Sequence, residues 1–89
     1  MPVKKEKKKN LVGVMSHFYG HINVGIVELS DTLSVGDEIS VEGASTNLTQ
    51  KVESIEIEHK AVKKAGKGDS IGLKMKERVR EGDKVYKLS

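Results

Sequence analysis

Apolar and polar residues alternate with a period of two along the N-terminal half of this chain. That period is typical of β-strands that bury one face, and it predicts three strands between residues 11 and 43. Gly20 is the only turn residue between the first two strands, and so short a connection predicts an antiparallel hairpin. The residues expected to face the core are Val12, Val14, Phe18, Ile22, Val24, Ile26, Ile39 and Val41.

The alternation changes phase once in the C-terminal half of the chain. Within residues 46–58, Leu48 and Val52 share one parity, whereas Ile55 begins the other. Such a change requires a bulge, or a strand that passes from one side of a barrel to another. We therefore expect a kink at Ser54, and small closed barrels use kinks of this kind to turn corners.

Residues 69–76 return to regular alternation, and residues 85–88 form the closing strand. Between the kinked segment and these strands, residues 59–68 form the longest connection, where glycines leave room for one helical turn at most. The count is about six strands and no substantial helix. We therefore expect an all-β fold, a six-stranded Greek-key closed barrel. A small barrel of the OB or SH3-like type stays open as an alternative.

Glycine and a few apolar loop residues predict local geometry. Three Gly-Asp steps each precede an expected strand, and we expect all three to form the same turn. They are Gly36-Asp37, Gly68-Asp69 and Gly82-Asp83. Gly13 lies in the middle of the first strand, which predicts that another backbone approaches closely there. Leu33 and Val35 are apolar residues in a connection, so we expect them to hold that loop against the core.

Charge separates a basic tail from a nearly neutral body. Residues 1–9 contain five lysines and one glutamate, a net charge of +4, which leaves −1 on the rest of a chain whose total is +3. We expect residues 1–10 to form a disordered basic tail and residues 11–89 to form a single β-barrel domain. The 89-residue chain has no cysteine, which excludes disulfides and thiolate metal sites.

Several classes of function are not expected from the sequence. No apolar run approaches the length of a membrane span, and the N-terminus lacks a signal-peptide core, so we expect a cytoplasmic location and no membrane partner. There is no G-x-x-x-x-G-K-[ST] phosphate loop, because the stretch from Gly66 to Asp69 has neither its spacing nor its hydroxyl. We therefore expect no bound nucleotide.

Candidate catalytic and metal-binding residues are few. His17 and His21 flank the first turn, but no carboxylate lies close in sequence to complete a zinc site, so we expect a polar hairpin tip and no metal. Glu53, Glu56 and Glu58 share one segment, where a solvated strand face is a simpler interpretation than a pair of carboxylates for acid–base chemistry. We expect no enzyme activity and no cofactor.

Basic residues are the best candidates for a binding site. Four of them fall at alternate positions, so in an extended strand they form a row with a spacing of about 6.6 Å, close to the repeat of phosphates along a nucleic acid. These four are Lys74, Lys76, Arg78 and Arg80. The connection before them adds Lys60, Lys63, Lys64 and Lys67. We expect these eight side chains to bind RNA, and the alternative is a solvated face that protects an edge strand.

A set of short motifs follows the order seen in a known family of barrels. The motifs are Gly25, Val27-Glu28, Leu33-Ser34-Val35-Gly36-Asp37, Ile39, Val41, Gly43, Val52-Glu53-Ser54-Ile55 and the run from Ala65 to Leu73. Together they resemble domain 2 of the translational GTPases, the β-barrel of elongation factor Tu and its relatives. The runs from Asp31 to Ile39 and from Gln50 to Ile55 also resemble the C-terminal barrel of a collagenase-like peptidase family.

The resemblance to translational GTPases implies a function in translation. It predicts a non-catalytic, elongation factor-like barrel that binds tRNA or the ribosome through its basic residues. The alternative is a protein-interaction module that docks on a larger enzyme or translation factor. The acidic segment and the first hairpin favour this alternative as much as the lysines favour RNA. Phe18 and Tyr19 point to opposite faces of their strand, so at most one ring belongs to the core.

Overall fold

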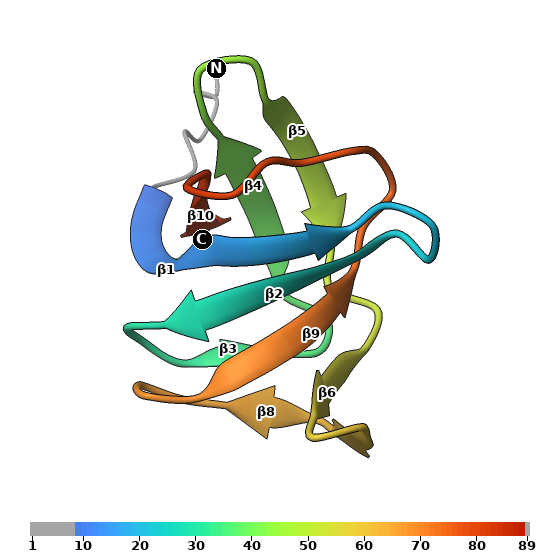
Figure 1. Ribbon diagram of the computed structural model, residues 1–89. Coiled ribbons are helices and arrows are strands. Elements are labelled where there is room, and N and C mark those ends of the chain that lie inside the picture. The colour runs from blue at the N-terminus through green and yellow to red at the C-terminus, as the bar shows by residue number, and fades with distance from the viewer. Residues whose placement is uncertain (1–8, 89) are drawn as a thin grey trace.

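A computed structural model describes residues 9–88, which form an all-β fold without a helix (Figure 1). The strands are β1 (Lys9–Tyr19), β2 (Val24–Leu29), β3 (Leu33–Ser34), β4 (Glu38–Glu42), β5 (Asn47–Lys51), β6 (Ile55–Ile57), β7 (Lys60–Val62), β8 (Lys64–Ala65), β9 (Ser70–Lys74) and β10 (Lys84–Leu88). Eight strands form an antiparallel sheet in the order β5-β4-β10-β1-β2-β9-β6-β7, and β3 pairs with β8. The predicted all-β class is confirmed.

The predicted closed barrel of six strands is not confirmed. The described residues form ten strands, and no ladder joins β5 to β7, the two ends of the long sheet. The expected strand over residues 46–58 is divided, because residues 52–54 leave the sheet between β5 and β6. The expected loop over residues 59–68 supplies β7 and β8 in place of a helical turn. The break at residues 52–54 does confirm the kink predicted at Ser54.

A side chain bridges β5 to the end of β9, where no backbone ladder does. Gln50 in β5 donates from Nε2 to the carbonyl oxygen of Lys74 over 2.8 Å, and its Oε1 accepts from the backbone N–H of Lys76 at 2.9 Å. The side chain is buried, at 6% exposed. One amide group therefore makes the two hydrogen bonds that a paired strand would make at this place.

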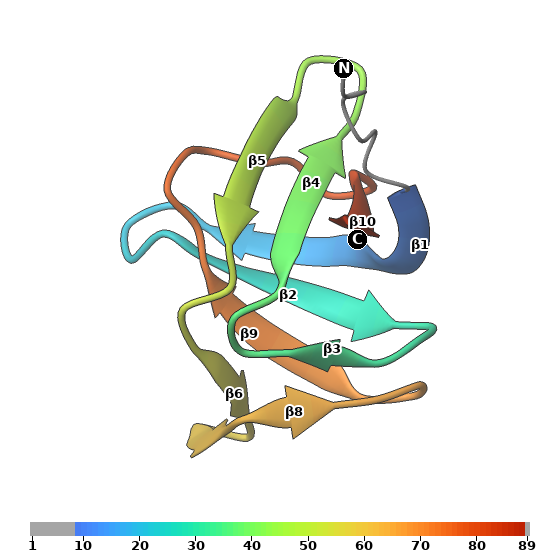
Figure 2. The same cartoon turned by 180° about the vertical axis from the view of Figure 1, so that it is seen from behind.

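One apolar core lies inside the curled sheet, and strands from both ends of the chain contribute to it. β1 and β10 lie side by side near the middle of the sheet, with β4 and β5 toward one end and β6 toward the other (Figures 1 and 2). The buried apolar residues are Val12, Met15, Val27, Leu29, Leu33, Ile39, Val41, Leu48, Val52, Ile55, Ala65, Ile71, Leu73, Met75, Val79 and Val85. The inward residues predicted in β4, Ile39 and Val41, are buried, and the alternation predicted for residues 69–76 is confirmed in β9.

The inward face predicted for β1 is partly wrong. Val12 is buried, but Val14 is 39% exposed and Met15 takes the buried position. The register of β1 shifts twice, between Leu11 and Gly13 against β10 and between Met15 and His17 against β2. Each shift inserts a residue and reverses the parity of the side chains, so a simple period of two fails here.

The inward face predicted for β2 is also wrong. Gly25, Val27 and Leu29 face the core, whereas Ile22 is 49% exposed and lies before the strand. A Cβ added at Gly25 would lie 2.5 Å from the sulfur of Met15, so the long methionine side chain occupies the space that a side chain at Gly25 would need. The apolar pattern predicted the wrong face because a glycine can face the core when a neighbouring side chain fills the space beside it.

Gly13 allows β1 and β2 to approach closely, as predicted. A Cβ added at this position would lie 2.7 Å from the carbonyl oxygen of Glu28 and 2.7 Å from Cγ1 of Val27. Both contacts are shorter than a carbon atom tolerates, and the carbonyl belongs to backbone that is paired on both sides in the sheet.

The three Gly-Asp steps form the same turn, as predicted. In each, the glycine has a positive φ (99°, 91° and 91° for Gly36, Gly68 and Gly82), which glycine adopts without a steric penalty. Each aspartate donates its backbone N–H to the carbonyl three residues earlier, over 3.0–3.1 Å. Its Oδ2 accepts in return from the backbone N–H of that same residue, over 2.8–2.9 Å. The first and last residues of each turn thus pair with each other, while the glycine N–H donates to a carbonyl elsewhere in the chain, that of Val52, Leu29 or Met15.

A charged cluster joins the start of β1 to β4. Lys9 Nζ lies 2.9 and 3.2 Å from the carboxylate oxygens of Glu42, and Ser40 Oγ donates to Glu42 Oε2 over 2.8 Å. Hydrogen bonds from Lys9, and then from Ser40, hold the pKa of Glu42 below its ordinary range. Lys9 and Asn10 therefore belong to a strand and not to the tail predicted over residues 1–10, and the rest of that tail lies outside the described residues.

Glu42→Gln is expected to lower stability slightly at neutral pH and not at strongly acidic pH. A carboxyl whose pKa is lowered by folding stabilises the folded state above the pKa of the unfolded chain, and this contribution is lost as the pH falls through the lowered pKa. The effect is small because the cluster lies at the surface. Urea-unfolding midpoints of the two proteins should converge on acidification, and a difference that stays constant with pH would contradict this role for Glu42.

Within residues 9–88 the structure has no helix able to cross a membrane. The cytoplasmic location expected from the sequence stays a prediction.

Candidate interaction surface

The eight basic residues predicted to bind RNA do not lie in one row. Lys60 lies in β7, Lys63 between β7 and β8, Lys64 in β8 and Lys67 in the turn before β9. Lys74 ends β9. Lys76, Arg78 and Arg80 lie in the irregular connection between β9 and β10. Of the four residues predicted to form a row, only Lys74 therefore lies in a strand. All eight side chains are exposed.

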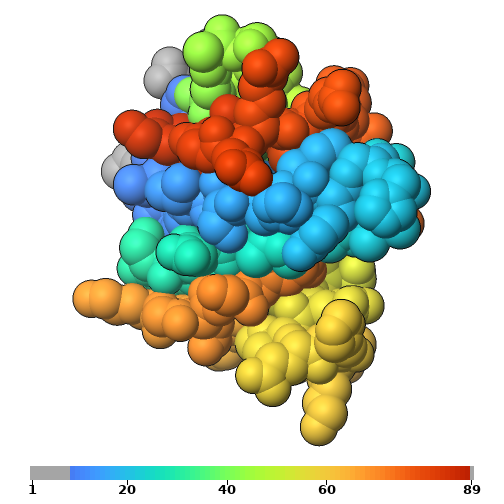
Figure 3. Space-filling model, in the orientation of Figure 1, coloured from blue at the N-terminus to red at the C-terminus, as the bar shows by residue number. Residues whose placement is uncertain are grey.

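The basic residues form two groups at opposite ends of β9. Lys67 precedes the strand and Arg78 follows it, and a strand of five residues spans about 16 Å. In the space-filling view, the yellow and light-orange segments that carry the first group lie at the bottom, and the orange-red connection lies at the top (Figure 3). The structure therefore separates side chains that the sequence pattern placed together.

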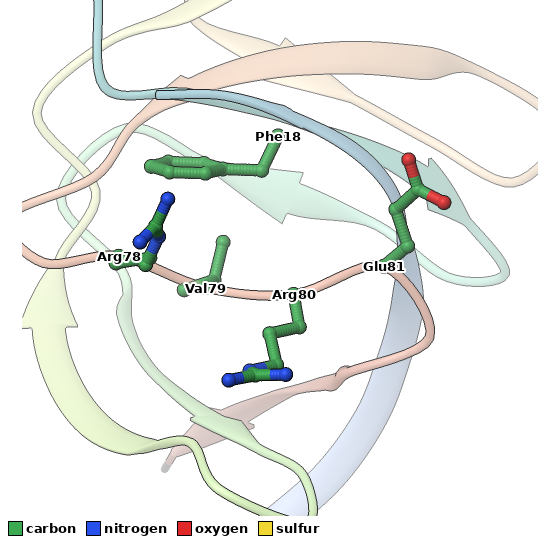
Figure 4. A pocket seen from close by; sticks show the side chains of 5 residues that line it. All are labelled: Phe18, Arg78, Val79, Arg80 and Glu81. Carbon is green, nitrogen blue, oxygen red and sulfur yellow. The ribbon is translucent and has the colours of Figure 1, made fainter. Parts of the chain in front are cut away.

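The second group borders an open hollow of about 560 Å³ (Figure 4). Its lining residues come from β1 and from the connection between β9 and β10: Phe18, Arg78, Val79, Arg80 and Glu81. The guanidinium of Arg78 points toward the Phe18 ring, and Arg80 extends in the other direction. We call this feature the Phe18 hollow. It combines a half-buried aromatic ring, packed against the core on one side, with two cationic side chains.

Backbone hydrogen bonds fix the connection that carries the arginines. At its start, the N–H of Met75 donates to the carbonyl of Asn23 over 2.7 Å, and Gln50 binds the residues on either side of Met75. At its end, Met15 exchanges two hydrogen bonds with the last Gly-Asp turn: its N–H donates to Asp83 over 2.7 Å, and its carbonyl accepts from Gly82 over 2.8 Å. Val79, at 2% exposed, anchors the middle in the core.

The tip of the first hairpin extends this surface. Tyr19 is 41% exposed and Ile22 is 49% exposed, and the His17 and Tyr19 rings meet edge to face with centroids 4.3 Å apart. His17 Nδ1 lies 2.9 Å from Glu81 Oε2, which ties the hairpin to the edge of the Phe18 hollow. Apolar, aromatic and charged groups therefore lie next to one another on one end of the molecule.

The structure brings together residues that the sequence analysis kept apart. Glu81 precedes the last Gly-Asp step, yet it pairs with His17 from 64 positions earlier in the chain. No carboxylate lies close to the hairpin histidines in the sequence, but the fold brings the carboxylate of Glu81 to His17. Among residues 9–88, no group of three histidine, aspartate or glutamate side chains is placed to hold a metal ion.

A second, smaller hollow of about 240 Å³ was not expected from the sequence. It lies where β2, β6 and β9 meet, and it is lined by Val24, Ser54, Glu56, Gly72, Leu73 and Lys74. A Cβ added at Gly72 would lie in ordinary contact, 3.5 Å from Val24, so the missing side chain opens this space. It offers one acidic and one basic group and no ring.

The chain resembles known proteins in both sequence and structure, although no family model matches it. It is 39% identical over 82 residues to an uncharacterized protease of Methanocaldococcus jannaschii, and 38% identical over 86 residues to a collagenase of Porphyromonas gingivalis. These alignments cover 91% and 94% of this chain, but 20% and 24% of the relatives. The chain thus spans about a fifth to a quarter of the curated relatives it matches.

Among solved structures, the C-terminal domain of a putative U32 peptidase from Geobacillus thermoleovorans superimposes with a TM-score of 0.84. The match covers 99% of this chain and 100% of that domain, at 19% sequence identity. This chain has the U32 C-terminal fold. A selenomethionine variant of the same domain gives a TM-score of 0.82 over 85% of the chain. The predicted resemblance to the C-terminal barrel of collagenase-like peptidases is supported by these matches.

The predicted function in translation is wrong, and the identification with elongation factor Tu domain 2 is not supported. The relatives with 38–39% identity are named as a protease and a collagenase, and the superimposed domain with the U32 C-terminal fold comes from a putative peptidase. The motifs that suggested translation factors include the run from Leu33 to Asp37, which forms the short strand β3 and one of the three Gly-Asp turns. Such a motif reports how a chain folds, and it carries little information about what the fold binds.

Proposed function

We propose that this chain is a non-catalytic docking module for a larger enzyme of the U32 peptidase type. The observation that carries the proposal is that this chain matches only one part of each of its longer relatives. A segment matching this chain makes up 20% of a protease and 24% of a collagenase, and the described residues form an eight-stranded and a two-stranded antiparallel sheet around one core. A module of this kind contributes by contact with the remaining part of the enzyme.

The placement of its polar side chains supports a non-catalytic role. His17 and Glu81 are a potential acid–base pair, but their side chains are 47% and 62% exposed. General acid–base catalysis gains most where water is excluded and a reacting group is held beside the pair. A pair on the surface of a hairpin instead fixes the connection beside it, as the hydrogen bonds of Met15 to the last turn also do.

The curled sheet supports this role as a rigid scaffold. We infer that it behaves as a closed barrel although its ends are not joined by a ladder, because Gln50 bridges β5 to the end of β9. A rigid scaffold holds an interaction surface in one arrangement, and it thus reduces the entropy lost on binding.

The proposal is tested by mixing the chain with the remaining part of a U32-type peptidase from the same organism, produced without its matching segment. We expect a one-to-one complex in analytical ultracentrifugation that survives ribonuclease treatment. We also expect the chain alone to release no peptides from gelatin. The absence of a complex would overturn the docking role, and gelatin hydrolysis by the chain alone would overturn the non-catalytic role.

A further inference from the structure

The lining of the Phe18 hollow has two cationic side chains and one acidic side chain, and neither cation is paired with a carboxylate of the described residues. The one acidic residue in its lining, Glu81, accepts a hydrogen bond from His17 at 2.9 Å, and its carboxylate points away from both guanidinium groups (Figure 4). Among residues 9–88, no carboxylate lies within ion-pair distance of Arg78 or Arg80. Two guanidinium groups thus present their donors to solvent beside an aromatic ring.

The hollow is also held in place before anything binds. Val79 is buried between the two arginines, and the connection is hydrogen-bonded to the first hairpin at both of its ends. Arginine and aromatic residues are enriched among the residues that dominate protein–protein binding energies. A guanidinium binds a carboxylate through two parallel hydrogen bonds, which favours a defined orientation of the partner.

We propose that the Phe18 hollow is the docking surface of this module, and that it binds an acidic segment of the partner protein. Carboxylates of that segment pair with Arg78 and Arg80, and an apolar side chain between them contacts the Phe18 ring. The inference rests on the proposed docking function, and it adds the surface and the chemistry of the partner.

A peptide fits the distribution of charge better than a nucleic acid does. A nucleic-acid backbone requires cations spaced along its length, and its affinity grows with the number of phosphates that are neutralised. Here the row predicted from the sequence is interrupted after Lys74, and the other cationic group begins at the far end of β9. Two cations around one ring suit a short segment with a few carboxylates and an apolar side chain.

The test uses two fluorescent peptides, Asp-Phe-Glu-Leu-Asp and its neutral counterpart Asn-Phe-Gln-Leu-Asn, with an oligouridylate of similar length as a third probe. We expect the acidic peptide to bind the wild-type chain, and the neutral peptide and the RNA to bind more weakly. The double variant R78Q/R80Q should weaken binding of the acidic peptide about tenfold, because two exposed ion pairs are lost.

The matched control is K63Q/K67Q, which removes the same charge from the far end of β9. It should change the affinity of the acidic peptide less than about twofold, since these charges lie outside the hollow. Both double variants change exposed side chains, so their urea-unfolding midpoints should equal that of the wild type. Equal loss of affinity in both variants, equal binding of the acidic and neutral peptides, or tighter binding of the RNA would each overturn the inference.

The same variants separate this inference from the proposed function. If the wild-type chain forms a complex with the peptidase and R78Q/R80Q forms it equally well, the docking role stands and the Phe18 hollow is the wrong surface. If R78Q/R80Q loses the complex while K63Q/K67Q keeps it, both proposals are supported. If the acidic peptide binds through the arginines but the peptidase does not, the chemistry of the hollow stands and the proposed partner is wrong.

Discussion

Replacing Gln50 with methionine is expected to destabilise the chain by about 2–4 kcal/mol. Methionine has a similar length and stays apolar, so the change removes two hydrogen bonds with little loss of packing volume. The carbonyl of Lys74 and the N–H of Lys76 then lose their partner in a part-buried position. Each group left without a partner costs more than a hydrogen bond contributes on average.

The measurement is urea unfolding followed by circular dichroism, with Thr49→Ala as the control. Thr49 is the neighbouring residue of β5 and its side chain faces solvent, so its replacement should change the unfolding free energy by less than about 0.5 kcal/mol. A Gln50→Met variant as stable as this control would show that the bridge from β5 to β9 contributes nothing. It would also remove the physical basis for treating the open sheet as a closed scaffold.

The bridge also bears on the interaction surface. The backbone groups that Gln50 binds lie where the connection with Arg78 and Arg80 begins. Loss of the bridge should therefore loosen the Phe18 hollow and weaken binding of the acidic peptide. Gln50 makes no contact with the hollow itself, so it acts as a positioning residue.

Gly13→Ala is the second substitution with a large expected effect, a destabilisation of about 2–3 kcal/mol. The added Cβ would lie 2.7 Å from the carbonyl oxygen of Glu28, and a backbone carbonyl cannot move aside as a flexible side chain can. Since β1 lies between β10 and β2, separation of β1 from β2 strains both ladders. The thermal midpoint should fall by about 4–8 °C for each kcal/mol lost.

Gly20→Ala is the matched control for this substitution. Gly20 lies in the turn that follows the same strand, its φ is not positive, and an added Cβ would meet only Phe18 Cε2, at 3.7 Å. Its replacement should change the unfolding free energy by no more than about 1 kcal/mol, in either direction. Similar midpoints for Gly13→Ala and Gly20→Ala would contradict the close approach of β1 and β2.

Local features were predictable because their causes lie within a few residues. Each Gly-Asp turn is formed by a glycine that adopts a positive φ and an aspartate whose carboxylate accepts from the backbone N–H three residues earlier. Both residues are visible in the sequence. The alternation of β4 and β9 also predicted their buried faces, because these strands pair without a shift of register. The kink at Ser54 follows from a change of phase within a dozen residues.

The faces of β1 and β2 could not be predicted in the same way. The parity of β1 depends on register shifts against two different partners, and the sequence of β1 does not show where it carries an extra residue relative to each of them. The buried position at Gly25 depends on the Met15 side chain that fills the space above it. Both effects come from residues distant in the chain, so the apolar pattern indicated the wrong face.

The sequence by itself determined the all-β class, the Gly-Asp turns and the list of exposed cations, because each depends on local residue chemistry. Only the tertiary structure decided which of those cations share a surface. In that structure β9 ends at Lys74 and Glu81 pairs with His17. Arg78 and Arg80 lie beside Phe18, which belongs to the first strand of the chain. The physical reason is that antiparallel pairing and one buried glutamine bring distant segments together, and no short-range pattern records such contacts.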